Sequence, residues 1–154
     1  YAMADASNAH NLIAANVLVA LHNRLRGRAC RPFNSDTKVR FRLQFYYPDV
    51  SVTCPPNPQS DSFQDEPTMV VEVLSPETRR IDEGEKLLAY TAIPSLLVYA
   101  MVEPARAQVV IVRRTASGFV RDVHAGLSAV VLLPELACEL PLADIYDGVE
   151  WALG

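Results

Sequence analysis

Long apolar runs, a leader and paired cysteines are all missing from the sequence. No stretch approaches the ~18 apolar residues that span a membrane, and no basic-then-apolar segment ends in a small-residue cleavage site. The three cysteines, Cys30, Cys54 and Cys138, show no Cys-x-x-Cys spacing, which argues against a zinc site or a disulfide framework. These absences predict a soluble protein that is not secreted and keeps its thiols reduced in the cytoplasm.

Positive charge is also scarce. The 154 residues include 14 Lys and Arg against 18 Asp and Glu, which gives a formal net charge of -4. This balance excludes a surface that is basic all over, although it leaves room for a local basic groove. A Ser/His/Asp context, a glycine-rich phosphate loop and internal repeats are likewise absent. Hydrophobic residues make up 50% of the chain, which is enough for the core of a single domain.

Apolar periodicity predicts a mixed sheet with helices packed on it, in the α/β (α+β) class. Helices are expected at residues 8–25, with Ser7 as the cap, 81–91 and 142–146. Strands are expected at residues 29–33, 38–43, 49–53, 68–74, 96–102, 108–113, 119–124 and 137–140. The run 68–74 has no polar face and should be a central strand covered on both sides. The proline-rich segment 54–67 should be the most mobile loop.

Glu72 is the residue least expected in this core. It lies between Val71 and Val73 in the most apolar run of the chain. An unpaired buried carboxylate costs several kcal/mol or becomes protonated, so a cationic partner is expected. That partner could be a structural Arg or Lys, or Glu72 could have a metal-binding or catalytic role, and the residue alone leaves both open.

Asp49 supplies a second carboxylate at the start of an earlier strand. After Pro48 it could be a turn residue, but if its strand pairs with that of Glu72, the two carboxylates can converge on one point. Such a point suits a hard divalent ion such as Mg2+, which prefers oxygen ligands. Lys86 lies four residues after Asp82, where its simplest role is an exposed ion pair worth about 0.2–0.5 kcal/mol.

These residues belong to strings that resemble a nuclease motif. YYPDVSV and, after a variable loop, MVVEVLSPETRRIDEGEKLLAY are similar to the PD-(D/E)XK nuclease superfamily. More specifically, they resemble the Uma-type family of bacterial restriction-endonuclease-like proteins. Supporting matches are AHN, CRPFNSDTKVR and LPLADIYDGVEW, so the resemblance covers Tyr1 to about Trp151.

The resemblance implies a restriction-endonuclease-like mixed β-sheet flanked by helices, with a site for Mg2+ or Mn2+. Asp49 and Glu72 would be its metal-binding acids, and the backbone carbonyl of Val73 would be a further ligand. Lys86 would replace the motif lysine, because the usual position, two residues after the second acid, is Leu74 here. Members of the family generally carry a further helix and strand before the position of Tyr1, so residues 1–154 are expected to form one domain without that segment.

The resemblance also implies supporting residues around the site. His10 and Asp82 are the candidate accessory groups. The arginines expected to contact backbone phosphates are Arg24, Arg28, Arg31, Arg79 and Arg80.

Together these features predict a metal-dependent DNA endonuclease that hydrolyses phosphodiester bonds. A homodimer is expected, because two sites are the simplest way to cut two strands, and no membrane is involved. The alternative is a catalytically inactive nuclease-fold protein that acts as a nucleic-acid-binding or assembly module, as the leucine at position 74 and the absent segment would suggest. A small-molecule hydrolase on the same scaffold has no sequence feature in its favour.

Overall fold

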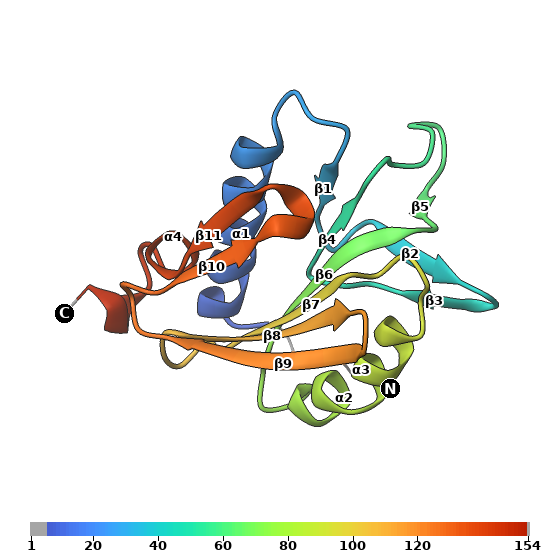
Figure 1. Ribbon diagram of the computed structural model, residues 1–154. Coiled ribbons are helices and arrows are strands. Elements are labelled where there is room, and N and C mark those ends of the chain that lie inside the picture. Colours follow the sequence, from blue (N-terminus) through green and yellow to red (C-terminus); the bar gives the residue numbers. More distant parts are fainter. Residues whose placement is uncertain (1–5, 154) are drawn as a thin grey trace.

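A six-stranded mixed sheet forms the centre of the protein (Figure 1). The computed structural model describes residues 6–153. The strands follow the order β1-β4-β6-β7-β8-β9, and every neighbouring pair is antiparallel except the parallel pair of β6 and β7. The bounds of these strands are β1 (Arg31–Phe33), β4 (Val50–Thr53), β6 (Pro67–Val73), β7 (Val98–Val102), β8 (Gln108–Thr115) and β9 (Gly118–Ala125).

Two small sheets and the helices surround this sheet. A three-stranded sheet has the order β3-β2-β5, and a two-stranded sheet pairs β10 with β11. Their strands are β2 (Lys38–Phe41), β3 (Gln44–Tyr46), β5 (Phe63–Gln64), β10 (Val130–Leu133) and β11 (Cys138–Pro141). The helices are α1 (Asn8–Leu25), α2 (Arg79–Glu83), α3 (Glu85–Thr91) and α4 (Leu142–Ile145), with 3-10 turns η1 (Pro134–Leu136) and η2 (Glu150–Ala152).

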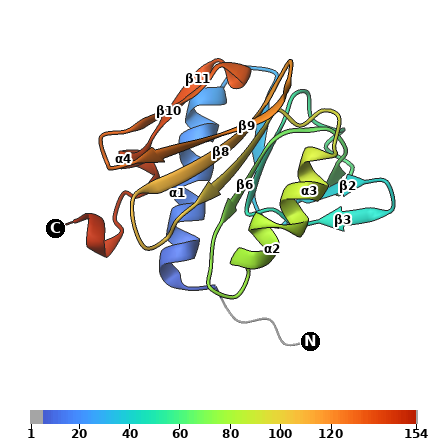
Figure 2. The same cartoon turned by 60° about the horizontal axis from the view of Figure 1, so that its bottom comes forward.

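Two apolar layers pack on opposite faces of the large sheet (Figures 1 and 2). On one face α1, α4 and the β10–β11 pair cover Val71 and Val73 of β6. On the other face α3 and the small β2 sheet cover Val70 and Leu74. Every residue of β6 is buried, which confirms the expected central strand between two layers.

The second expected helix is in fact two helices. Gly84 separates α2 from α3, and a Cβ at this position would lie 2.9 Å from the backbone oxygen of Arg80. The helical spacing of the apolar residues continued across this glycine, so the sequence predicted one continuous helix. The strands β3, β5 and β10 were also not expected, and β5 lies within the proline-rich segment 54–67.

The cysteine prediction is wrong. Cys30 and Cys54 form a disulfide with their Cα atoms 4.1 Å apart, and Cys138 is free. The two half-cystines flank the cross-strand pair Arg31↔Thr53 of β1 and β4, so strand pairing brings them together. Their separation of 24 residues gives no hint of this pairing in the sequence alone.

Among the residues that the structure describes, no helix is long and apolar enough to cross a membrane. The family strand expected around Tyr1 lies outside the described residues.

Candidate active site

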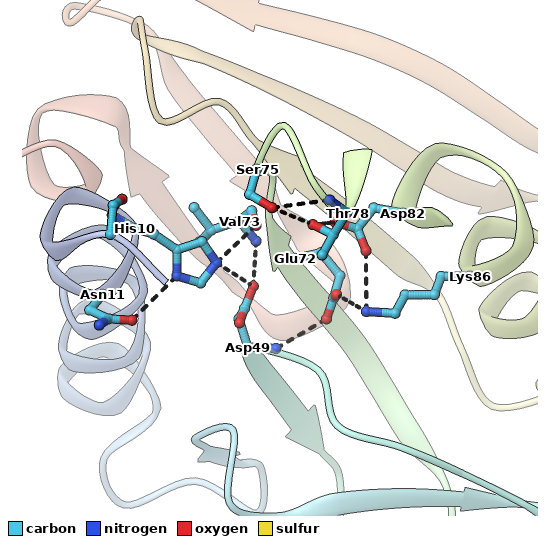
Figure 3. A network of polar contacts seen from close by, with 10 residues as sticks. His10, Asn11, Asp49, Glu72, Val73, Ser75, Thr78, Asp82 and Lys86 are labelled. Carbon is cyan, nitrogen blue, oxygen red and sulfur yellow. Dashed lines mark hydrogen bonds and ion pairs between the residues drawn. The ribbon is translucent and has the colours of Figure 1, made fainter. Parts of the chain in front are cut away.

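Asp49 and Glu72 lie beside each other where β4 meets β6. The antiparallel register pairs Val50 with Val71, so Asp49 and Glu72 occupy the next positions. The backbone N–H of Asp49 donates to Oε1 of Glu72 (3.1 Å), and the backbone N–H of Val73 donates to Oδ2 of Asp49 (2.7 Å). Each carboxylate is therefore oriented by the backbone of the other strand, as Figure 3 shows.

Lys86 reaches these acids from α3. Its Nζ lies 2.6 Å from Oε2 of Glu72 and 3.2 Å from Oδ1 of Asp82. Asp82 is only 1% exposed, and its Oδ2 accepts a hydrogen bond from the hydroxyl of Thr78 (3.0 Å). The simplest interpretation of Asp82 and Lys86, an exposed ion pair, is therefore wrong, because the pair points inward to Glu72 (Figure 3).

His10 closes the site from the side of α1. Ser7 accepts a hydrogen bond from the backbone N–H of His10 at the start of the helix, which fixes the first turn. The ring atom Nε2 lies 3.0 Å from the carbonyl oxygen of Val73 and 3.3 Å from Oδ2 of Asp49. Because a carbonyl oxygen can only accept, Nε2 carries the proton. The imidazole N–H thus lies between the Val73 carbonyl and the Asp49 carboxylate, the two groups that would also bind a cation.

The site carries an excess of negative charge. Burial raises the pKa of Glu72 from 4.5 to about 8, with Lys86 opposing this shift and Asp49 and Asp82 adding to it. Burial is the largest single effect on Lys86 and would lower its pKa, but the charges and contacts of Glu72 and Asp82 together outweigh it, so the pKa is raised. The hydrogen bond to Asp49 raises the pKa of His10 against the effect of burial. All three groups hold protons tightly, as expected where carboxylates outnumber cations.

The donor atoms of this site match a hard divalent ion in their chemistry. Oxygens of Asp49, Glu72 and the Val73 carbonyl are the kind of ligand that Mg2+ prefers. Within residues 6–153, no group of three or more His, Cys, Asp or Glu side chains is arranged to hold a metal ion. Protein groups already engage Oδ2 of Asp49 and both oxygens of Glu72. Oδ1 of Asp49 accepts no hydrogen bond from the described residues, so it and the second lone pair of the Val73 carbonyl offer places for a cation.

Three of the arginines expected to contact phosphates are engaged within the fold instead. They donate hydrogen bonds to Asp144 or to backbone carbonyls: Arg24, Arg28 and Arg31. Arg24 follows His10 by fourteen residues, which is about 21 Å along a helix, so this group lies at the far end of α1 from the site. A phosphate contact there stays a prediction.

The two arginines of α2 differ from each other. Arg79 contacts both oxygens of the buried Glu103, with N–O distances of 2.6 and 2.8 Å. Arg80 is exposed and forms no ion pair with the residues that the structure describes. Of this pair, Arg80 has the guanidinium that remains available to a ligand, and its phosphate contact also stays a prediction.

Comparison with known proteins identifies the family and the fold. The profile of the Uma2 family, described as "Putative restriction endonuclease", matches residues 1–143. The chain belongs to the Uma2 family. An uncharacterized protein of Synechocystis sp. is 35% identical over 152 residues, covering 97% of this chain and 80% of that protein. The crystal structure of a "putative nuclease belonging to DUF820" from Anabaena variabilis has a TM-score of 0.77 at 18% identity, covering 95% of this chain and 84% of that one, and thus the same fold.

The family and the fold class predicted from the sequence are therefore confirmed. In this Uma2 protein the fold also brings together Asp49, Glu72 and Lys86, although their roles stay predictions. No motif singled out Thr78 and Ser75, whose hydroxyls lie 2.8 Å apart and lead to Asp82. The only available signal was their position after the strand that carries Glu72, in the string SPET.

Proposed function

We propose that this protein is a metal-dependent nuclease that hydrolyses phosphodiester bonds in DNA. The observation that carries the proposal is the convergence of Asp49, Glu72 and Lys86 in one network, with Nζ of Lys86 2.6 Å from Glu72. Membership in the Uma2 family supports a nuclease of the restriction-endonuclease type. A purely structural ion pair would need one acid for one lysine, whereas this lysine has two buried acids and Asp49 adjoins them.

In this proposal Asp49, the Val73 carbonyl and Glu72 hold Mg2+ or Mn2+. A bound divalent ion of this type polarises a phosphoryl oxygen and lowers the pKa of bound water. Asp49 is kept in position by the N–H of Val73, and its Oδ1, which accepts no hydrogen bond from the described residues, is left for the ion. Burial raises the pKa of Glu72 and Lys86 opposes that shift, so a bound divalent ion would add the positive charge that makes Glu72 an ionised ligand.

Lys86 is proposed to stabilise charge on the attacked phosphate and to orient the attacking water. A Lys ammonium has three donors, and the hydrogen bond to Glu72 uses one of them. Oδ1 of Asp82 is an ion-pair partner at 3.2 Å that accepts no hydrogen bond from the described residues, so donors are left for a substrate oxygen. Asp82, held by Thr78, limits the rotamers of the lysine, so the amine is aimed before substrate binds.

The decisive experiment is cleavage of supercoiled plasmid DNA with Mg2+ or Mn2+ by wild type and by Glu72→Gln. Glutamine keeps the shape of the side chain and one acceptor oxygen, but it removes the charge and replaces the other acceptor, used by Asp49 or by Lys86, with an NH2 donor. We expect cleavage by wild type and a loss of at least about a hundredfold in the variant, about 2.7 kcal/mol of transition-state stabilisation.

The matched control is Glu77→Gln, which changes an exposed glutamate in the turn before α2. It should cleave at the rate of wild type. Equal activity of wild type and Glu72→Gln would refute the proposal. Absence of cleavage in both, together with no binding of a divalent ion in a calorimetric titration with DNA present, would favour the inactive binding or assembly module.

A homodimer is part of the same proposal, because each chain contributes one such site and a duplex has two strands. Light scattering after size exclusion gives the mass of the protein directly. A protein mass of 17.0 kDa, which is that of a single chain of residues 1–154, would contradict a dimer if it were found both with and without DNA.

A further inference from the structure

The small sheet formed by β3, β2 and β5 carries an unusual set of side chains on its outer face. Val39 is fully buried and pairs with Tyr46, whose ring packs against the buried Tyr90, so this side of the sheet faces the core. Neighbouring residues along a strand point the other way. The outer face therefore carries Lys38 and Arg40 from β2, Phe45 from β3 and Phe63 from β5.

Cations and aromatic rings alternate on this face. Nζ of Lys38 lies 5.2 Å from the ring centre of Phe45, and Cζ of Arg40 lies 3.9 Å from that of Phe63. Asp65 binds Arg40 through both oxygens, at 2.7 and 3.0 Å, and so holds its guanidinium over the ring. Lys38 has no carboxylate partner among the described residues, so its charge remains available to a ligand.

The tip of the β2–β3 hairpin extends this pattern away from the body (Figures 1 and 2). Arg42 adopts a left-handed backbone conformation with φ 56° and lies over the ring of Phe41 at 4.9 Å. Leu43 next to it is 97% exposed. Like Lys38, Arg42 forms no ion pair within residues 6–153. The hairpin thus has one unpaired cation on its outer face, Lys38, and one at its tip, Arg42, over a ring that packs toward the core.

The hairpin leads directly into the candidate active site. Phe45 is 52% exposed, Tyr47 is 57% exposed, and Asp49 follows after Pro48. Two exposed rings, at alternate positions, thus precede the acid in the sequence. Aromatic rings attract unstacked bases whatever their sequence, and neighbouring cations follow the backbone phosphates.

We propose that the β2–β3 hairpin binds a single-stranded stretch of nucleic acid and feeds it to the site at Asp49. Phe45 and Tyr47 stack on unpaired bases, and Lys38 and Arg42 contact phosphates. The inference rests on the proposed nuclease function. It adds that the β2–β3 hairpin contacts the substrate and that the nucleic acid is single-stranded where it does so. An exposed apolar face intended for a protein partner would not need a cation beside each ring.

The test is binding of a fluorescent oligothymidylate, followed by anisotropy with Ca2+ in place of Mg2+. Phe45→Ala and Tyr47→Ala should each weaken binding by about 5- to 150-fold, as for the loss of one stacked base. Phe45→Leu, which keeps an apolar side chain, should bind as poorly as Phe45→Ala, and Phe45→Trp should restore affinity. Lys38→Gln and Arg42→Gln should each reduce the slope of log affinity against log salt by about 0.7.

Matched controls come from the exposed strand β9, at the far edge of the large sheet. Val123→Ala removes an exposed apolar side chain and Arg121→Gln an exposed cation, and both should leave binding unchanged. Wild-type affinity in Phe45→Ala and Tyr47→Ala would overturn the proposal. So would a loss of affinity confined to duplex DNA, or wild-type affinity in Phe45→Leu.

Plasmid cleavage separates this proposal from the proposed function. If wild type cleaves DNA and the hairpin variants bind normally, the hairpin proposal fails and the nuclease stands. If the hairpin variants lose affinity but wild type never cleaves with Mg2+ or Mn2+, the hairpin binds nucleic acid and the proposed chemistry fails.

Discussion

Two buried glutamates in this protein are neutralised in different ways. Glu72 is 3% exposed and shares one lysine with Asp82, while Glu103 is 3% exposed and has a bidentate contact with Arg79. The fork of a guanidinium matches a carboxylate with two parallel hydrogen bonds, whereas an ammonium acts as a point charge. The pKa of Glu103 is accordingly lowered by Arg79 despite its burial, but that of Glu72 is raised. Glu103 is thus held ionised by its structural ion pair with Arg79. The raised pKa of Glu72 would fall if a further cation bound beside it.

This difference predicts an acid dependence of stability that belongs to Glu103. A carboxyl whose folded pKa lies below its ordinary value of 4.5 stabilises the fold above that value, and the contribution is lost as the pH falls through the folded pKa. Glu103→Gln should therefore cost about 1–3 kcal/mol near neutral pH, and its difference from wild type should shrink in acid. Denaturant unfolding of both proteins between about pH 7 and about pH 3 measures this.

The matched control for Glu103 is Glu139→Gln, which changes an exposed glutamate on β11. Its stability should follow that of wild type at every pH. A difference between Glu103→Gln and wild type that is constant across the pH range would show that Arg79 gains nothing from the charge of its partner.

At the scale of elements, the weakest part of the large sheet is its β1 edge. β1 has only three residues, includes Pro32, and pairs with β4 alone. A proline cannot donate to a sheet ladder, so β1 has few backbone hydrogen bonds. The disulfide between Cys30 and Cys54 links the ends of β1 and β4. Because Asp49 immediately precedes β4, the covalent link also stabilises the strand that presents the first acid.

Replacing both half-cystines by alanine should destabilise the protein by about 3.5 kcal/mol, the chain-entropy value for a separation of 24 residues. In a protein of this size that is a fall of roughly 7–14 °C in melting temperature. Calorimetric scans of wild type, Cys30→Ala/Cys54→Ala and the control Cys138→Ala measure it. Cys138 is the free cysteine, so its variant should melt much closer to wild type.

Thiol titration provides an independent check. Native protein should react with one equivalent of a thiol reagent, at Cys138, and reduced unfolded protein with three. Three reactive thiols in native protein, with no change in melting temperature on reduction, would rule out the bond between β1 and β4.

Long helices and strands whose apolar residues repeat at a regular spacing could be predicted from the sequence. The expected helix at residues 8–25 matches α1, because a serine cap and repeated apolar residues define it locally. The expected meander matches β7, β8 and β9, which are neighbours in the sheet. Strands of two to four residues, such as β3, β5 and β10, contain too few residues for a period. They form only because pairing supplies their hydrogen bonds.

The candidate site was predictable to the extent that it is local in sequence. The resemblance placed Asp49, Glu72 and Lys86, and the register of β4 and β6 then accounts for the contact between the acids. The contact of His10 with the Val73 carbonyl spans 63 residues and depends on how α1 packs on the sheet. No spacing in the sequence indicates that His10 would contact Val73, and none indicates that Asp82 would be buried.

At the scale of the whole molecule, the positions of the charged residues explain how an acidic protein could act on DNA. The net charge of -4 disfavours association with DNA at long range. At the point where a phosphate would lie, Asp49, Glu72 and Asp82 bring together three carboxyl groups, with Lys86 and His10 as the basic groups in contact with them. The cations without a carboxylate partner among the described residues include Lys38 and Arg42, which contact none of these acids. The protein is therefore expected to repel a phosphate from the site until a divalent ion is present.

This charge distribution predicts that DNA affinity depends on the divalent ion more than on salt. In EDTA near physiological ionic strength, the Kd should be no lower than the nonspecific range of about 1–100 μM. Ca2+, a hard oxygen-preferring ion, should strengthen it at least about tenfold at equal ionic strength, because it neutralises the acids at the phosphate position. The same addition to Glu72→Gln should have a smaller effect, since one ligand has lost its charge. Anisotropy titrations with and without Ca2+ measure both. Submicromolar affinity in EDTA, with the steep salt slope of six or more phosphate contacts, would mean that an extended basic surface binds DNA independently of the acidic site.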